Sequence, residues 1–262
     1  MNFFLFFLKN IKILRPIFLA YYKTKLYLQA FLRLPYKLRI NDSKIFIKSF
    51  DWKVSNFVKS GEVRGGSLYY EEEEMALFKC LIKGNETFFD VGAHIGYYSF
   101  VAAGANVKNI VSFEVVKSLA SMIRKNAQHN GIAIEVIPKG VGLNGAPIKF
   151  EDSLYSAEGE AISLDVYSKT QSVLPDFLKV DVEGFEYDVL MGAQTIIRES
   201  KPIILVAIHP RFLKERGVNK NHINQFFYDN GYRVLRRVND TLLAVHKHNE
   251  FNILHKLKES GI

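Results

Sequence analysis

One short block near residue 90 constrains the fold of this chain more than any other feature. It reads Phe88-Phe-Asp90-Val-Gly92-Ala-His94-Ile-Gly96-Tyr-Tyr98, an apolar run that leads into a turn containing two glycines. Glycine lets a backbone approach a ligand closely, and the free amides at the start of a following helix can receive an anion. The block therefore predicts a strand, a tight ligand-binding turn and a helix.

The remainder of the chain alternates apolar segments with helical patterns, as a parallel sheet with helices on both faces requires. Strands are predicted at 87–91, 109–114, 134–138, 177–182 and 202–208, and helices at 71–82, 96–103, 117–130, 186–199 and 220–230. Polar residues at 147–164 predict an inserted loop or hairpin, and 232–247 predicts an antiparallel hairpin turning at Asn239-Asp240. We expect an α/β, Rossmann-like fold with a mostly parallel sheet and a C-terminal antiparallel hairpin.

Positive charge is concentrated before residue 70. Residues 1–69 hold 13 Lys+Arg and 3 acids, and the rest hold 22 and 24, so the net charge of +8 divides into +10 and −2. A near-neutral core makes nucleic acid an unlikely partner, although the basic extension could still contact phosphates. We expect two parts, residues 1–68 as a basic extension of helices and short strands, and residues 69–262 as the catalytic domain. Alternating patches such as 44–47 and 56–58 predict short strands of a small antiparallel sheet, and Gly65-Gly66 predicts a turn after them.

Residues 1–40 combine eight basic side chains with ten Phe and Tyr and contain no acid. Their uncharged runs are far shorter than the roughly 18 apolar residues that cross a bilayer. The first apolar run precedes the first positive charge, so we expect no cleaved signal peptide. Basic aromatic helices of this kind lie in membrane headgroups, or pack on the domain or on another subunit. Both alternatives stay open.

The cysteine content bears on the compartment and on metal binding. Cys80 is the single cysteine, which excludes an internal disulfide and favours the cytoplasm, with peripheral contact to the inner membrane face as an option. The His and Cys residues supply no adequate set for structural zinc. Four acids at 71–74 are read as the solvated first turn of a helix and not as a metal site. We therefore assign no metal.

Two acids end neighbouring strands of the predicted sheet. Asp90 would repel a pyrophosphate but can hold the ammonium of a methionine moiety. Glu114 can accept hydrogen bonds from both ribose hydroxyls of a nucleoside, as acids do in dinucleotide folds. Neither a phosphate-binding Gly-Lys-Ser/Thr nor a full Gly-x-Gly-x-x-Gly is present. The alternative is that both acids merely cap the following helices.

A third acidic block follows the fourth predicted strand, Phe177-Leu-Lys179-Val-Asp181-Val-Glu183-Gly184-Phe-Glu186. The first and fourth strands of such a sheet end at one crevice, so Asp181 and Glu183 should border a ligand. Lys179 is expected to point into the sheet or pair with an acid, and Glu186 to stabilise a helix dipole. Asp181 and Glu183 are candidate catalytic residues, which would either orient the acceptor hydroxyl or hold a divalent ion.

His209 follows the fifth predicted strand. Its ordinary pKa lies near neutrality, which suits a general base better than the carboxylates nearby. A structural histidine beside Pro210 explains the same residue equally well. We keep His209 as the first candidate for the base.

Four blocks together resemble the signature of the FkbM-type methyltransferases: Phe89 to Tyr98, Phe113-Glu114, Ser163-Leu-Asp165 and Lys179 to Glu186. The likeness spans about residues 87–209. It implies S-adenosylmethionine as methyl donor and usually a hydroxyl acceptor, often on a sugar, glycan or secondary metabolite. By position, the residues assigned to the cofactor are Asp90, Gly92, His94, Gly96 and Glu114.

Three residues depart from the pattern of that family. His94 stands where Asn is common, Val115 where Pro is common, and Ala207 where an acid is frequent. His94 and Val115 can preserve their turns. Ala207 removes a carboxylate near the acceptor, which could change the substrate, the mechanism or activity itself.

The expected function is O-methylation of a hydroxyl on a sugar, glycan or lipid-linked glycan, with a small-molecule or glycan acceptor as partner. One alternative is a glycosyltransferase in which Asp181 and Glu183 hold a metal ion and a nucleotide sugar. Another is a membrane-associated adapter that binds the cofactor without catalysis, which Ala207 would allow. The sequence leaves the oligomeric state open.

Overall fold

The computed structural model describes residues 36–40, 45–49, 62–64, 67–82, 86–151 and 155–262, and it divides into two compact units, residues 1–72 and 73–262. The helices expected before residue 36, the strand at 56–58, the Gly65-Gly66 turn and most of the proposed membrane contact lie outside the described residues. The described part of the first unit is a four-stranded sheet in the order β2-β1-β4-β3. Its strands are β1 (Tyr36–Ile40), β2 (Phe46–Ser49), β3 (Glu62–Arg64) and β4 (Ser67–Tyr69).

The small sheet is mixed, which corrects the expectation of an antiparallel one. β1 pairs antiparallel with β2 but parallel with β4, with Arg39 opposite Ser67. An alternating pattern identifies a strand without fixing its partner, and the parallel pair joins segments far apart in the chain. The direction of that pairing therefore could not be predicted from the local pattern.

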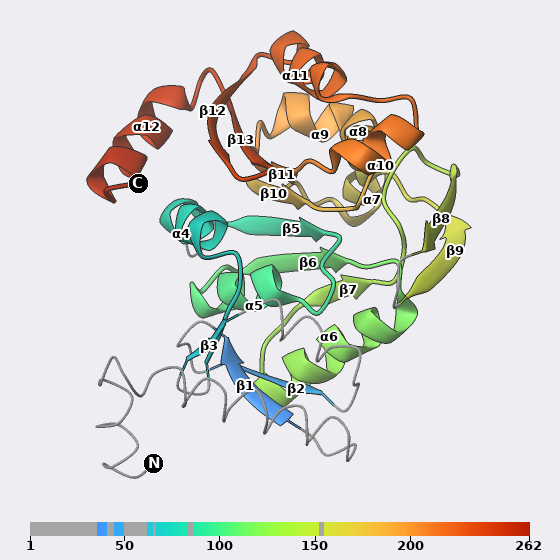
Figure 1. The fold of residues 1–262 in the computed structure, drawn as a ribbon, viewed down its shortest axis with the longest axis vertical. Helices are drawn as coiled ribbons and strands as arrows, with labels where there is room; N and C mark the ends of the chain where they lie inside the picture. Colours follow the sequence, from blue (N-terminus) through green and yellow to red (C-terminus); the bar gives the residue numbers. More distant parts are fainter. Residues whose placement is uncertain (1–35, 41–44, 50–61, 65–66, 83–85, 152–154) are drawn as a thin grey trace. The chain divides into compact units, whose positions relative to one another are not determined.

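The second unit is built on a seven-stranded sheet in the order β12-β13-β11-β10-β5-β6-β7 (Figure 1). The strands are β5 (Thr87–Val91), β6 (Asn109–Phe113), β7 (Glu135–Ile137), β10 (Phe177–Val180), β11 (Ile203–Ala207), β12 (Tyr232–Val238) and β13 (Thr241–His246). β13 runs antiparallel to both of its neighbours, and every other neighbouring pair is parallel. The predicted Rossmann-like α/β fold with its antiparallel hairpin is confirmed.

The helices of the second unit begin with α4 (Glu72–Leu81), α5 (Tyr97–Gly104), α6 (Lys117–Asn130) and α7 (Leu164–Gln171), and continue with α8 (Glu186–Met191), α9 (Gln194–Glu199), α10 (Pro210–Glu215), α11 (Lys220–Asp229) and α12 (Glu250–Glu259). Helices α7, α10 and α12 were not predicted. The predicted insertion is a hairpin of β8 (Pro147–Glu151) and β9 (Ser156–Glu160). The carboxyl ends of β5 and β6 point toward this hairpin (Figure 1). No helix within the described ranges is long and apolar enough to cross a membrane.

The central strand β5 is buried along its whole length, which fixes the site that follows it. Phe88 packs on one face with Phe78 of α4, at 5.1 Å between ring centroids. Phe89 packs on the opposite face against Tyr167 of α7 at 5.6 Å. Successive side chains of a strand point to opposite faces, so a strand covered on both faces is apolar throughout. Each buried Phe contributes about 1.5–3 kcal/mol.

The single helix predicted over 186–199 is wrong, because the structure breaks it into α8 and α9 at Gly192. A β-carbon on Gly192 would lie 2.2 Å from the backbone oxygen of Gly142, so the chain passes too close for a side chain there. The carboxylate of Asp165 then accepts hydrogen bonds from the amides of Thr195 and Ile196 at 2.9–3.0 Å. Asp165 thereby starts a new helix.

The first turn of α4 also differs from expectation. Glu72 and Glu73 are exposed, as a solvated turn requires, but Glu74 is buried. Its Oε1 accepts a hydrogen bond of 2.7 Å from the side chain of Asn239, in the turn between β12 and β13. Glu74 therefore stabilises packing between α4 and the hairpin.

Candidate cofactor and acceptor site

The turn after β5 depends on two glycines with left-handed backbones. Gly92 has φ +79°, and a β-carbon there would lie 1.8 Å from the backbone oxygen of Asp181. Gly96 has φ +83° at the start of α5, and its β-carbon would meet Phe100 at 3.0 Å. The turn is also bonded to β6, since the amides of Gly92 and Ala93 both donate to the Phe113 carbonyl at 3.0 Å. Close packing therefore requires both glycines.

Asp90 is fully buried near the end of β5. Its Oδ2 accepts hydrogen bonds from the Ser99 backbone amide at 3.1 Å and from the Ser99 hydroxyl at 2.6 Å. Its Oδ1 accepts no hydrogen bond, with the Lys179 Nζ 3.9 Å away. Burial raises the pKa of Asp90 above its ordinary value, and Lys179 and Ser99 offset only part of that rise. Asp90 thus caps α5 with one oxygen, while the other is buried within ion-pair distance of Lys179 and accepts no hydrogen bond.

Glu114 lies directly after β6 and is buried. Its Oε2 accepts the His94 backbone amide at 2.7 Å, and its Oε1 accepts the Val116 amide at 2.8 Å. Burial raises the pKa of Glu114 to about 7, although both of these hydrogen bonds oppose the rise. The helix-capping alternative is thus realised for Asp90, which accepts the Ser99 amide of α5, but not for Glu114, whose two amide partners lie outside α6. Each Glu114 oxygen nevertheless keeps a second lone pair for a further donor.

Lys179 links the ends of β5 and β10, where it stands opposite Asp90 in the strand register. Its Nζ lies 3.1 Å from Asp181 Oδ2, and 4.5 Å from the ring centroid of Tyr98. The expected pairing of Lys179 with an acid is confirmed. Burial alone would raise the pKa of Asp181, but Lys179 and then His209 hold it below its ordinary value. Asp181 is therefore an anion at neutral pH.

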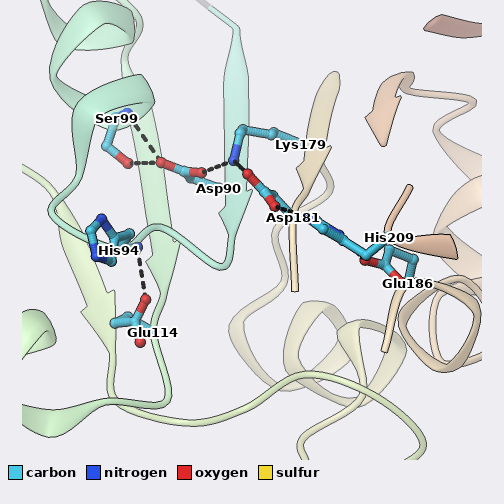
Figure 2. A network of polar contacts seen from close by, with 8 residues as sticks. All are labelled: Asp90, His94, Ser99, Glu114, Lys179, Asp181, Glu186 and His209. Atoms are coloured by element: carbon cyan, nitrogen blue, oxygen red, sulfur yellow. Dashed lines mark hydrogen bonds and ion pairs between the residues drawn. The ribbon is translucent and has the colours of Figure 1, made fainter. Parts of the chain in front are cut away.

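His209 is placed by the end of β11 and by Pro210, the first residue of α10. Its Nδ1 lies 2.6 Å from Oε1 of Glu186, and its Nε2 lies 3.6 Å from Oδ1 of Asp181. Burial alone would lower the pKa of His209, but the bond to Glu186 and the charge of Asp181 raise it. Figure 2 shows Asp90, Lys179, Asp181 and His209 in one row that ends at Glu186.

Glu186 is fully buried at the start of α8, so its role exceeds the helix-dipole effect expected for it. Both of its oxygens accept the Gly184 amide, at 3.0 and 3.1 Å. Glu183 and Gly184 have φ of +47° and +104°, and a β-carbon on Gly184 would lie 2.6 Å from that of Phe212. Glu186 therefore fixes a strained turn and the His209 ring together. Glu183 lies in that turn, and its side chain is exposed to solvent.

His94 lies on the glycine turn, near Glu114 (Figure 2). Its backbone has φ +52°, which Asn also tolerates well, so the departure from the family residue preserves the turn. Its ring lies 6.1 Å from that of Tyr155, a buried residue just before β9, in an edge-to-face contact. Ala207 ends β11 opposite Thr241.

The predicted cofactor residues Asp90, Gly92, His94, Gly96 and Glu114 all lie around the ends of β5 and β6, and Asp181 and His209 lie side by side. Sequence reasoning missed the roles of Ser99 and Glu186. For Ser99, the signal was a hydroxyl in the first turn of the helix that Asp90 precedes. Across the ranges that the structure covers, no three His, Cys, Asp or Glu residues form a group suited to a metal ion.

Several solved structures are similar to this chain. The methyltransferase FkbM from Methylobacillus flagellatus KT shares 21% identity over 74% of this chain and 53% of its own, with a TM-score of 0.45. The precorrin-6y C5,15-methyltransferase from Geobacter metallireducens GS-15 shares 12% over 67% and 86%, with a TM-score of 0.42. The chain thus spans about half of the first protein.

A third similar structure is TrmK of M. capricolum in complex with S-adenosyl-homocysteine, at 13% identity over 66% of this chain and 67% of that one, with a TM-score of 0.40. No curated protein matches the chain in sequence. The family model of the Methyltransferase FkbM domain matches residues 90–234, more than half of the chain and the whole row of site residues. This chain therefore belongs to the FkbM methyltransferase family.

Proposed function

We propose that this protein transfers the methyl group of S-adenosylmethionine to a hydroxyl oxygen of a sugar, glycan or lipid-linked glycan. The observation that carries the proposal is the placement of His209. Its Nδ1 contacts Glu186 at 2.6 Å, which leaves Nε2 on the side of Asp181 next to the glycine turn. An imidazole held in this way is an oriented base beside a nucleoside-type site.

The residues around the turn fit the cofactor. Asp90 keeps a buried carboxylate oxygen that accepts no hydrogen bond, which suits an ammonium group. Glu114 retains one lone pair on each oxygen, which suits two ribose hydroxyls. Gly92 has no β-carbon, which lets the turn pack directly against the backbone of Asp181. The cofactor would supply a methyl group bonded to a positively charged sulfur. The sulfur is the leaving group and keeps the electron pair of the carbon–sulfur bond.

His209 accepts the proton of the acceptor hydroxyl. With its Nδ1 proton donated to Glu186, neutral His209 offers the Nε2 lone pair to an acceptor hydroxyl. The hydroxyl loses its proton to Nε2 while its oxygen forms the new bond to the methyl carbon. Glu186 then stabilises the imidazolium that results. General base catalysis of this kind contributes about 10²–10⁴-fold.

Asp181 and Glu183 orient the acceptor. Both follow β10 at the edge of the site, Asp181 as a carboxylate held by Lys179 and Glu183 on the strained turn. Orientation before reaction removes much of the entropic barrier of a two-substrate reaction. The Lys179 ammonium already pairs with Asp181 Oδ2 and would compete with a metal ion for the charge of that carboxylate. We therefore do not propose the glycosyltransferase alternative.

The test measures turnover with a panel of methyl glycosides and lipid-linked glycans, followed as S-adenosylhomocysteine release. A methyl ether should form on one acceptor, and His209→Gln should lose turnover by about 10²-fold or more while binding S-adenosylmethionine with unchanged affinity. A product methylated on nitrogen or carbon would contradict the proposal. So would full activity of the His209→Gln variant. Manganese with a nucleotide sugar should produce no calorimetric response.

A further inference from the structure

Two hydrogen-bond acceptors stand side by side at the candidate acceptor position. When His209 is neutral and its proton sits on Nδ1 for Glu186, Nε2 carries a lone pair. That nitrogen lies 3.6 Å from Oδ1 of Asp181, a carboxylate oxygen that also only accepts. Both side chains are partly open to solvent, at 29% and 27% exposed. The reactive state of the base therefore presents a matched pair of acceptors.

The two acceptors are fixed before any ligand arrives. Lys179 binds the other oxygen of Asp181 at 3.1 Å, which turns Oδ1 toward His209. Glu186 binds the far nitrogen of His209 at 2.6 Å and is itself locked by the Gly184 amide. Such supporting contacts are what hold a binding site in a productive geometry. Their spacing can therefore be read as a template for the ligand.

A pair of acceptors at this spacing calls for two donors on neighbouring atoms. Two hydroxyls on adjacent carbons, gauche to each other, hold their oxygens slightly closer together than 3.6 Å. Two parallel hydrogen bonds of ordinary O–H length, about 2.7–2.8 Å, can then reach His209 and Asp181 together. A lone hydroxyl satisfies only one of the two and leaves the other partner without its donor.

We propose that Asp181 selects acceptors that carry a second hydroxyl next to the one methylated, so that the substrate class is a vicinal diol. The reacting hydroxyl donates to Nε2 of His209, and its neighbour donates to Oδ1 of Asp181. This inference rests on the proposed function and adds a specificity-determining residue to it. Asp181 takes no proton in the reaction.

The probes are trans-1,2-cyclohexanediol, whose equatorial hydroxyls are gauche, and cyclohexanol, which has one hydroxyl on the same ring. Binding is followed by the ring signals of His209 in NMR spectra, assigned with His209→Gln and recorded with S-adenosylhomocysteine above the midpoint of the His209 titration. The diol should move the His209 signals at a concentration at least about tenfold lower than cyclohexanol, as one additional hydrogen bond to a charged group predicts.

Two variants separate the role of Asp181 from a general loss of negative charge. Asp181→Asn should lose the preference for the diol because an amide NH₂ replaces an acceptor, whereas Glu259→Gln, at an exposed acid of α12, should keep it. Equal responses to the two probes, no response to either, or an unchanged preference in Asp181→Asn would each overturn the inference. Failure of the proposed function has a different signature, the absence of cofactor binding. If alcohols with and without a neighbouring hydroxyl are methylated at similar rates, the proposed function still holds, but Asp181 does not select the acceptor.

Discussion

Gly92 and Asp181 touch so closely that a β-carbon on the glycine would lie 1.8 Å from the backbone oxygen of the aspartate. The amide of Asp181 in turn donates to the carbonyl of Val91 at 2.9 Å. The turn assigned to the cofactor and the residue assigned to the acceptor are therefore packed as one piece. Methyl transfer depends on alignment between two bound molecules, and this contact fixes the relative position of the two sides.

Replacing Gly92 by Ala should lower the free energy of unfolding by more than the strain of a left-handed backbone alone would. The matched control is Gly145→Ala, since Gly145 has φ +75° but nothing within 4 Å of its β-carbon. The control should lose about 1–2 kcal/mol. Gly92→Ala should lose at least about 2 kcal/mol more because Asp181 must shift. Urea unfolding curves measure both, and equal midpoints would show that the contact is not tight.

Cofactor binding should release protons through Glu114. With its pKa raised to about 7, this buried carboxyl is half protonated in the free protein at pH 7. Ribose hydroxyls that donate to it favour the charged form, so binding should release about half a proton at pH 7 and almost none at pH 9. Calorimetric titration with S-adenosylmethionine in buffers of different ionisation enthalpy measures the release. Glu114→Gln should remove it, and binding heats that do not depend on the buffer at pH 7 would refute the prediction.

The acidic limb of the activity profile should report His209. Its pKa is raised above 6.5 by Glu186 and Asp181, so the neutral base is lost as pH falls through a midpoint above that value. Glu186→Gln removes a negative neighbour and should move the limb to lower pH. Glu186→Ala should also lower kcat at the plateau, because the imidazole loses its orienting partner. An acidic limb that stays in place in Glu186→Gln would mean that another group titrates.

The same pKa shift has a consequence for stability. A histidine whose pKa is raised on folding stabilises the folded protein fully below the unfolded value, near pH 6.5. This stabilisation is lost as pH rises through the folded value. The difference in unfolding free energy between wild type and His209→Gln should therefore shrink between mildly acidic and alkaline pH. A difference that grows with pH would reverse the assigned sign.

Asp165 belongs to a signature block of the family, but the structure gives it a structural role. Its carboxylate accepts the amides of Thr195 and Ile196, the first turn of α9. Asp165→Ala should cost about 1–2 kcal/mol, as the loss of a helix cap does. The dissociation constant for S-adenosylmethionine, measured well below the melting temperature, should not change. A large loss of affinity in the folded variant would place Asp165 in the binding site instead.

The local patterns were sufficient for the sheet and for the cofactor turn. Asp90, Gly92 and Gly96 lie in one continuous strand–turn–helix pattern, whose geometry is set by neighbours in the chain. Glu114 follows the next strand of the same local pattern. Glu186 could not be assigned in this way, because its partner His209 is 23 residues away and meets it only once β10 and β11 are paired. The break between α8 and α9 likewise depends on a distant contact, with the backbone at Gly142.

Binding of S-adenosylmethionine is tested most directly by calorimetric titration of the purified full chain, beside Asp90→Ala, Glu114→Ala and the Asp165→Ala control. We expect saturable binding that weakens by about tenfold or more in the first two variants, provided their melting curves show them folded, and that is unchanged in the third. No binding by the folded wild type, or equal affinity in all four proteins, would contradict this expectation.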